Sequence, residues 1–104
     1  MKIWRMRPDG SGQEQVSRDD YHDWFAHLSP DGTRMLYVSY PPSVPAARHP
    51  RNERITIREQ DLATGTVRAV AHLYGGQGTM NVPSWSPDGK SVAFVSYTYG
   101  DPRA

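Results

Sequence analysis

Four residues that could bind a cation lie close together in the segment SRDDYHDW at residues 17–24. They are Asp19, Asp20, His22 and Asp23. Carboxylate oxygens and an imidazole nitrogen suit a divalent metal ion or a cationic ligand. Aspartates in a loop more often accept hydrogen bonds from turn backbones and remain solvated. We therefore predict no metal ligands and no cofactor, and a divalent cation stays an open alternative.

Nucleophilic catalysis has weaker support in the sequence. No G-x-S-x-G nucleophile elbow is present, and none of the four histidines lies in a recognisable nucleophile–base arrangement. The glycine-rich stretch YGGQGTMN (74–81) lacks the Lys and following Ser or Thr of a phosphate-binding loop, and no helical pattern follows it. We therefore predict no catalytic residues, and the non-catalytic interpretation is favoured.

The composition favours a single domain of short strands and many turns. The chain has 104 residues, of which 37% are hydrophobic and 11% aromatic, with nine glycines and nine prolines. A net charge of +1 without a run of either sign gives no support for nucleic acid binding. The chain has no cysteine, which excludes disulfides. One early lysine is followed by no apolar run, so neither a signal peptide nor membrane insertion is predicted.

One hairpin occurs twice in the chain. HLSPDGTRMLYVSY (27–40) and SWSPDGKSVAFVSY (84–97) share seven of fourteen residues at an offset of 57. In each SPDG turn, proline fixes the first position, aspartate can bond the backbone two residues on, and glycine supplies the left-handed position. The predicted structural turn residues are Ser29, Pro30, Asp31, Gly32, Ser86, Pro87, Asp88 and Gly89. The strand that follows each turn is apolar on both faces, so both faces should be covered.

The duplication extends upstream of each hairpin. Residues 3–16 and 55–70 each read as strand, turn, strand. The predicted fold is therefore all-β, a single domain of eight strands over residues 1–104. Its units span about 2–40 and 55–97, a proline-rich loop lies at 41–54, and a tail at 98–104. Without the loop the repeat is about 43 residues long, the period of a four-stranded propeller blade. An eight-stranded sandwich or barrel with a chance repeat is the alternative.

The repeated motifs resemble those of a known family. LSPDGTRMLYVSY and WSPDGKSVAFVSY, with IWRMRPDGSG before them, resemble the Asp-containing WD40-like repeats of TolB-type β-propellers. GGQGTMNVPSWSPDGKSVAFVSY looks like the closing region of TolB-related proteins, so the chain resembles a C-terminal two-blade portion of such a protein. The resemblance covers nearly the whole chain. It implies a six-bladed propeller, an envelope or transport-associated scaffold, and a periplasmic or extracytoplasmic location.

Two blades alone would leave apolar faces uncovered. In a propeller blade the strands run from A, innermost, to D, outermost, and this chain has the strand order C-D-A-B-C-D-A-B. Three copies joined head to tail would complete every blade and close a six-bladed homotrimer. Two or four copies would give four or eight blades, and a fragment of a longer protein is the other alternative. The side chains expected to need cover are Trp4, Tyr37, Trp85, Phe94 and Val95.

Three long segments, 17–24, 41–54 and 72–81, should emerge on one face of the propeller. The predicted ligand or partner face consists of Asp20, His22, Asp23, Trp24, Arg48, His49, Gln77 and Asn81. The function predicted first is a scaffold that self-assembles and binds a protein or peptide through this face. A hydrolase or lactonase with a metal held by Asp20, His22 and Asp23 is one alternative. A part of a larger TolB-like protein, without independent function, is the other.

Overall fold

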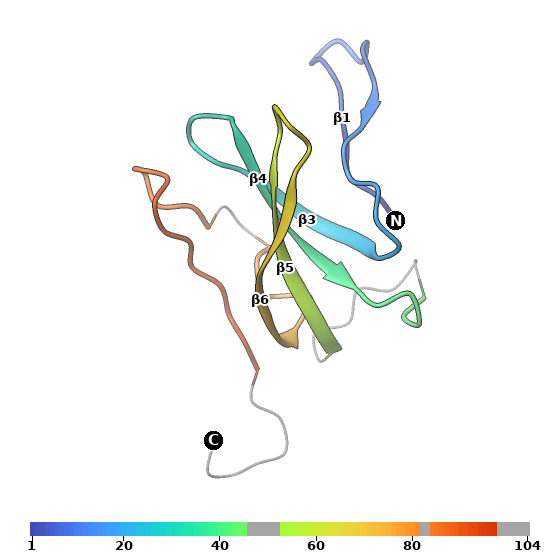
Figure 1. The fold of residues 1–104 in the computed structure, drawn as a ribbon, viewed down its shortest axis with the longest axis vertical. Coiled ribbons are helices and arrows are strands. Elements are labelled where there is room, and N and C mark those ends of the chain that lie inside the picture. Colours follow the sequence, from blue (N-terminus) through green and yellow to red (C-terminus); the bar gives the residue numbers. More distant parts are fainter. Residues whose placement is uncertain (46–52, 82–83, 98–104) are drawn as a thin grey trace.

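The computed structural model of the protein describes residues 1–45, 53–81 and 84–97. These residues form strands β1 (Trp4–Arg5), β2 (Glu14–Gln15), β3 (His22–Leu28), β4 (Arg34–Tyr40), β5 (Glu53–Asp61) and β6 (Val67–Gly75) (Figure 1). All strand pairs are antiparallel, which confirms the all-β prediction. Within this part of the chain there is no helix of the length and apolar character that crossing a membrane requires.

The centre of the molecule is one four-stranded sheet in the order β3-β4-β5-β6. Strands β1 and β2 form a separate hairpin, and a bridge between Trp85 and Val92 closes a third hairpin near the C-terminus. In Figure 1 the first hairpin and the C-terminal segment lie on opposite sides of the sheet. Along the chain, one strand pair is followed by a complete four-stranded sheet and then by a second strand pair, which agrees with the predicted order C-D-A-B-C-D-A-B.

Of the two predicted four-stranded blades, the described residues contain one as a complete sheet, and the other is present only as two separate strand pairs, β1-β2 and the hairpin bridged by Trp85 and Val92. The complete sheet joins the second half of the first predicted unit to the first half of the second. The outer half-blades cannot pair with each other because the central sheet separates them. Strand β5 begins at Glu53, so the end of the predicted loop 41–54 is strand, and residues 46–52 lie outside the description. The predicted tail 98–104 lies outside it as well.

The two faces of the central sheet differ in chemistry. One face presents Leu36, Val38 and Tyr40 of β4 together with Ile55 and Ile57 of β5, all buried in one apolar cluster. The C-terminal hairpin packs on this face. The opposite face carries more polar groups and is covered by the N-terminal segment. Every residue from 35 to 40 is buried, as the two-sided apolar pattern of β4 predicts.

The SPDG turns are held by their aspartates. Asp31 Oδ1 accepts hydrogen bonds from the Ser29 hydroxyl at 2.7 Å and from the backbone N–H two residues on at 3.0 Å. Asp88 accepts the equivalent bonds at 2.6 and 3.0 Å. These bonds, led by those from the serine hydroxyls, lower the pKa of Asp31 to about 2 and hold the pKa of Asp88 below its usual value. Gly32 and Gly89 have φ of 74° and 71°, the left-handed region that favours glycine.

Candidate functional site

Strand β3 contains three of the residues predicted to lie in a ligand-facing loop. His22, Asp23 and Trp24 pair with β4, and Asp23 lies opposite Ser39. The prediction of a loop over 17–24 was wrong for these three, because the period-2 pattern of β3 begins at His22. Asp23 is fully buried, His22 and Trp24 are partly buried, and Asp20 is exposed. Of the predicted acidic cluster, only Asp20 faces solvent freely.

The acidic cluster already has a cation, the ammonium group of Lys2. Lys2 Nζ lies 3.1 Å from Asp19 Oδ1 and 3.9 Å from Asp23 Oδ2, and it donates to the Tyr21 carbonyl at 2.6 Å. The other oxygen of Asp19 accepts a bond from Arg58 at 2.8 Å. Within the described residues, no three His, Asp or Glu side chains are placed to hold a metal ion. The geometry of Asp20, His22 and Asp23 thus gives no support to a metal-dependent enzyme.

Sequence reasoning missed Lys2 and Arg58 as partners of this cluster. Lys2 is seventeen positions from Asp19, and Arg58 is thirty-nine positions from it. Arg58 also lies over the ring of Tyr21, with its guanidinium carbon 4.1 Å from the ring centroid. The cluster therefore ties the N-terminal segment to β5. No local pattern signals this contact, because it depends on which hairpin covers the polar face.

Burial dominates the titration of Asp23. It raises the pKa of this carboxyl to about 6, although hydrogen bonds from Ser17 and Ser39 oppose the shift, and the negative charge of Asp19 adds to it. The Ser39 hydroxyl donates to Asp23 Oδ1 at 2.8 Å. Burial would also raise the pKa of Asp19, but its bonds from Lys2 and the Tyr21 N–H outweigh that effect and lower it. The pKa values of the two neighbouring carboxyls are therefore shifted in opposite directions.

This arrangement predicts a stability maximum in mild acid. The folded pKa of Asp23 lies above its unfolded value of 3.8, so its contribution is complete below about pH 4 and is lost as the pH rises through about 6. We expect the free energy of unfolding to rise by about 1.3 kcal/mol between about pH 7 and pH 5. Below about pH 4 the stability falls again, because Asp19 and the turn aspartates have lowered pKa values and become protonated. Urea denaturation across this pH range measures both the rise and the fall of the unfolding free energy.

The matched variant for this prediction is Asp23→Asn, which keeps the size of the side chain and cannot ionise. Its unfolding free energy should stay level where that of the unaltered chain rises. A parallel rise in both proteins would show that Asp23 is not the group responsible.

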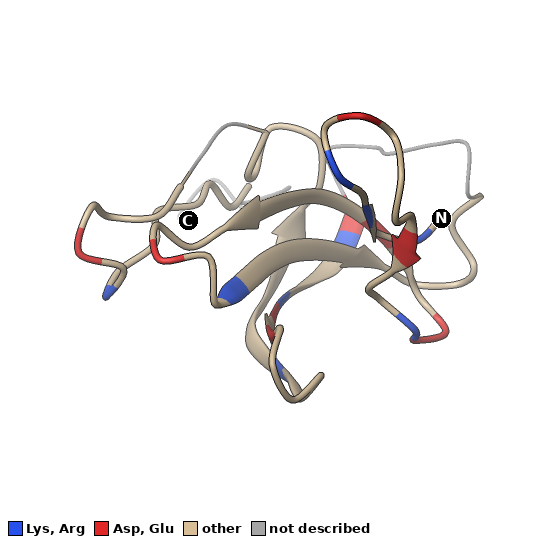
Figure 2. Cartoon of the chain, turned by 90° about the horizontal axis from the view of Figure 1, so that it is seen from above, with Lys and Arg blue, Asp and Glu red and all other residues tan. Residues whose placement is uncertain are grey.

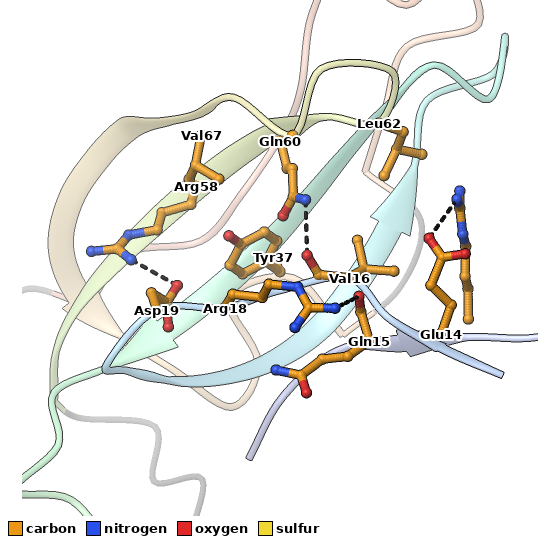
Figure 3. Close-up of a pocket in the computed structure, with 12 residues that line it drawn as sticks. Glu14, Gln15, Val16, Arg18, Asp19, Tyr37, Arg58, Gln60, Leu62 and Val67 are labelled. Carbon is orange, nitrogen blue, oxygen red and sulfur yellow. Dashed lines mark hydrogen bonds and ion pairs between the residues drawn. The ribbon is translucent and has the colours of Figure 1, made fainter.

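A cleft of about 410 Å³ lies between the N-terminal hairpin and the polar face of the sheet (Figure 3). It is lined by Arg5, Glu14, Gln15, Val16, Arg18, Asp19, Tyr37, Arg58, Gln60, Leu62, Gly65 and Val67. Ion pairs at its rim join Arg58 to Asp19 and Arg5 to Glu14, each at 2.8 Å. The ion pairs neutralise these four groups, so the charge that remains on the cleft lining is that of Arg18, which donates to the Gln15 carbonyl at 3.2 Å.

Two buried polar groups of this cleft lack hydrogen-bond partners. The hydroxyl of Tyr37 has none among the residues that the structure describes, although the side chain is fully buried. Gln60 donates through Nε2 to the Val16 carbonyl at 2.9 Å, but its Oε1 has no partner. Burial, and after it the charges of Asp23 and Asp19, raise the pKa of Tyr37, so its hydroxyl remains protonated. In the sequence Tyr37 is part of an apolar strand pattern, and no local signal there indicates this cleft.

The strand edges of the two hairpins are open. Ile3 accepts a hydrogen bond from Val16 at 2.8 Å, so the alternation of antiparallel bonds turns the main chain of Trp4 away from β2. Val95 donates inward to Thr79 at 3.1 Å, which likewise turns the main chain of the residues beside it outward. Each half-blade therefore offers unpaired main-chain groups along one edge.

The remaining predicted ligand residues are dispersed. Gln77 and Asn81 are exposed in the loop after β6, where Asn81 Oδ1 accepts from the Gly78 N–H at 2.9 Å. The Gln77 backbone also hydrogen-bonds to the Tyr40 hydroxyl. Arg48 and His49 lie outside the described residues. In the part of the chain that the structure describes, no hydrogen bond or ion pair joins Gln77 or Asn81 to the acidic cluster.

In a β-propeller each four-stranded antiparallel sheet packs face to face against its neighbours. The central sheet has this arrangement, because an outer strand pair packs on one of its faces and an inner strand pair on the other. The chain is similar to a solved structure from Agrobacterium tumefaciens that is provisionally named TolB, with 45% identity and a TM-score of 0.88. It is also similar to the TolB of Acinetobacter baumannii, with 27% identity and a TM-score of 0.71. These matches cover 94% and 95% of this chain, and 35% and 22% of the solved chains.

The chain is therefore a TolB-like β-propeller segment. An uncharacterised protein of Agrobacterium fabrum is 45% identical over 97 residues, which are 93% of this chain. The chain spans about a third of the length of that relative, 32%. No protein-family model matches the sequence.

Proposed function

We propose that the chain is a non-catalytic propeller scaffold that completes its blades by edge-to-edge association with further copies of itself. Three copies would form a six-bladed ring. The ring would bind a protein or peptide partner through its long-loop face, where Asp20, Gln77 and Asn81 are exposed. The proposal includes no cofactor, nucleic acid or membrane insertion. The TolB likeness supports a periplasmic location.

The observation that carries the self-assembly is the unequal burial of the duplicated hairpin. Tyr37 and Val38 in the complete blade are fully buried. Their counterparts 57 positions later, Phe94 and Val95, are 40% and 50% exposed. The same motif is thus covered where the outer strand pair is present and uncovered where it is missing. The exposed edge of the C-terminal hairpin fits the role of an inner pair that awaits strands β1 and β2 of another copy.

Within the described residues, the N-terminal half-blade, β1-β2, lacks an inner strand pair. Trp4 and Met6 are exposed beside the free edge of β1, which in a complete blade would pair with a strand of the inner pair. Each chain contains one complete blade and two halves, so three chains account for the six blades that the TolB resemblance implies. In a longer protein, neighbouring segments of the same chain would complete these edges instead.

The mass of the 104-residue chain in solution tests this proposal. Light scattering on a sizing column, over a tenfold range of concentration, should give one species of about 35 kDa, three times 11.7 kDa. A stable monomer or a polydisperse aggregate would contradict self-assembly. It would favour the alternative that the chain works only as part of a larger TolB-like protein.

A further inference from the structure

The cleft between the N-terminal hairpin and the central sheet has unused hydrogen-bonding capacity of a defined kind. Gln60 Nε2 donates to Val16, which fixes the side-chain amide and leaves Oε1 as an acceptor facing the cleft. The Tyr37 hydroxyl faces the same space and can donate (Figure 3). A buried polar group without a partner lowers the free energy of unfolding, because it has lost its hydrogen bonds to water. A ligand that satisfies both groups would recover that free energy.

We propose that this cleft binds a peptide segment, one of whose amide groups donates to Gln60 and accepts from Tyr37. An amide carries one donor and one acceptor in a single rigid plane, which matches this pair of groups. A peptide bound in this cleft would be a partner of the proposed scaffold, and in that respect the inference rests on the proposed function. The cleft is built from a single chain, so it does not depend on ring assembly.

The surroundings favour a neutral ligand with an apolar side chain. The ion pairs Arg58–Asp19 and Arg5–Glu14 leave Arg18 as the one unpaired charged lining residue among the described residues, and they leave no unpaired carboxylate for a metal ion. Leu62 and the exposed Val67 line the cleft beside Gln60. They offer apolar surface for a residue such as leucine. The cleft volume of about 410 Å³ suits a ligand of one or two residues.

The duplicated hairpin supplies independent support. The position that matches Tyr37 in the second copy is Phe94, which has the same ring without the hydroxyl. A propeller hairpin of this sequence can therefore be built with phenylalanine at this position. The hydroxyl of Tyr37 is not required by the hairpin motif, and it occurs in the copy that faces the cleft.

The experiment is a titration of the chain with N-acetyl-leucine amide, followed by NMR signals of the Gln60 side-chain amide. We expect saturable shifts, and a binding constant about tenfold weaker in Tyr37→Phe. The matched control is Tyr74→Phe, which makes the same change on β6 outside the cleft and should bind like the unaltered chain. Tyr37→Phe should also keep the solution mass and should raise the unfolding free energy, because it removes a buried hydroxyl that has no partner among the described residues.

Equal binding by Tyr37→Phe and the unaltered chain would overturn the proposal, and so would the absence of saturable shifts. Saturable binding of glucose in place of the amide would overturn the peptide class and assign the cleft to a polyol. None of these results bears on the 35 kDa species, so failure of this inference and failure of self-assembly are distinguishable.

Discussion

The variant Val95→Lys should run as a single chain of 11.7 kDa under conditions where the unaltered chain forms a trimer. Val95 is half exposed, whereas Val38, its counterpart in the complete blade, is fully buried. Assembly would bury Val95 in the same way, and lysine would place a charge in that environment. Loss of the valine contact and the cost of desolvating the ammonium together amount to about 3 kcal/mol per interface, more than a hundredfold in affinity.

The chain contains a matched control for this variant. Val70 is 37% exposed on the outermost strand β6, where no further strand is expected to pair. Val70→Lys makes the same substitution at a similarly exposed valine and should leave the mass near 35 kDa. Dissociation by both variants would point to a general effect of charge. A trimer that survives Val95→Lys would place the interface elsewhere.

Replacement of Gly75 by valine should destabilise the chain by about 3 kcal/mol, because this position has no room for a side chain. A Cβ atom built on Gly75 would lie 2.2 Å from Thr79 Oγ1 and within 3.4 Å of both Leu73 and Ile55. The Thr79 hydroxyl itself accepts the Gly76 N–H at 2.9 Å and is buried. The clash therefore disrupts the loop that leads from β6 to the C-terminal hairpin.

Urea denaturation of Gly75→Val measures this effect, with Ala69→Val on the same strand as the control. Ala69 is exposed, so its enlargement should change the unfolding free energy by less than about 0.5 kcal/mol. Thr79 also accepts the Val95 N–H at 3.1 Å, so Gly75→Val should loosen the C-terminal hairpin as well. An unchanged unfolding free energy would show that the loop adapts without loss.

The fold was largely predictable because its signals are local. The period-2 pattern after each SPDG turn and the duplication of the hairpin fix the strands and their order. The predicted strand order also implied that one half of each unit joins the other in the central sheet, as β3-β4-β5-β6 do. The site was predicted least well. Lys2 comes from the N-terminal segment, Tyr37 from β4, and Arg58 and Gln60 from β5, and only the covering of the polar face brings these elements together.

The acidic residues illustrate the limit of reading chemistry from spacing. Asp19, Asp20 and Asp23 look equivalent in the sequence, yet one is paired with Lys2 and Arg58, one is solvated, and one is buried. Burial is decided by strand register: Asp23 lies opposite Ser39 and turns toward the N-terminal segment. Figure 2 shows that most other acidic residues lie in turns and at strand ends.

The two faces of the central sheet differ in chemistry. A propeller built from this unit would therefore have two kinds of interface, or seam, between neighbouring blades. One seam is dry and aliphatic, and the other is wet and held by Lys2, Asp19 and Arg58. The wet seam should respond to pH and ionic strength, whereas the dry seam responds mainly to temperature. Around a closed ring the two would alternate. Mechanical or chemical stress would then part the blades at every second seam, so that the ring would yield in pairs of blades.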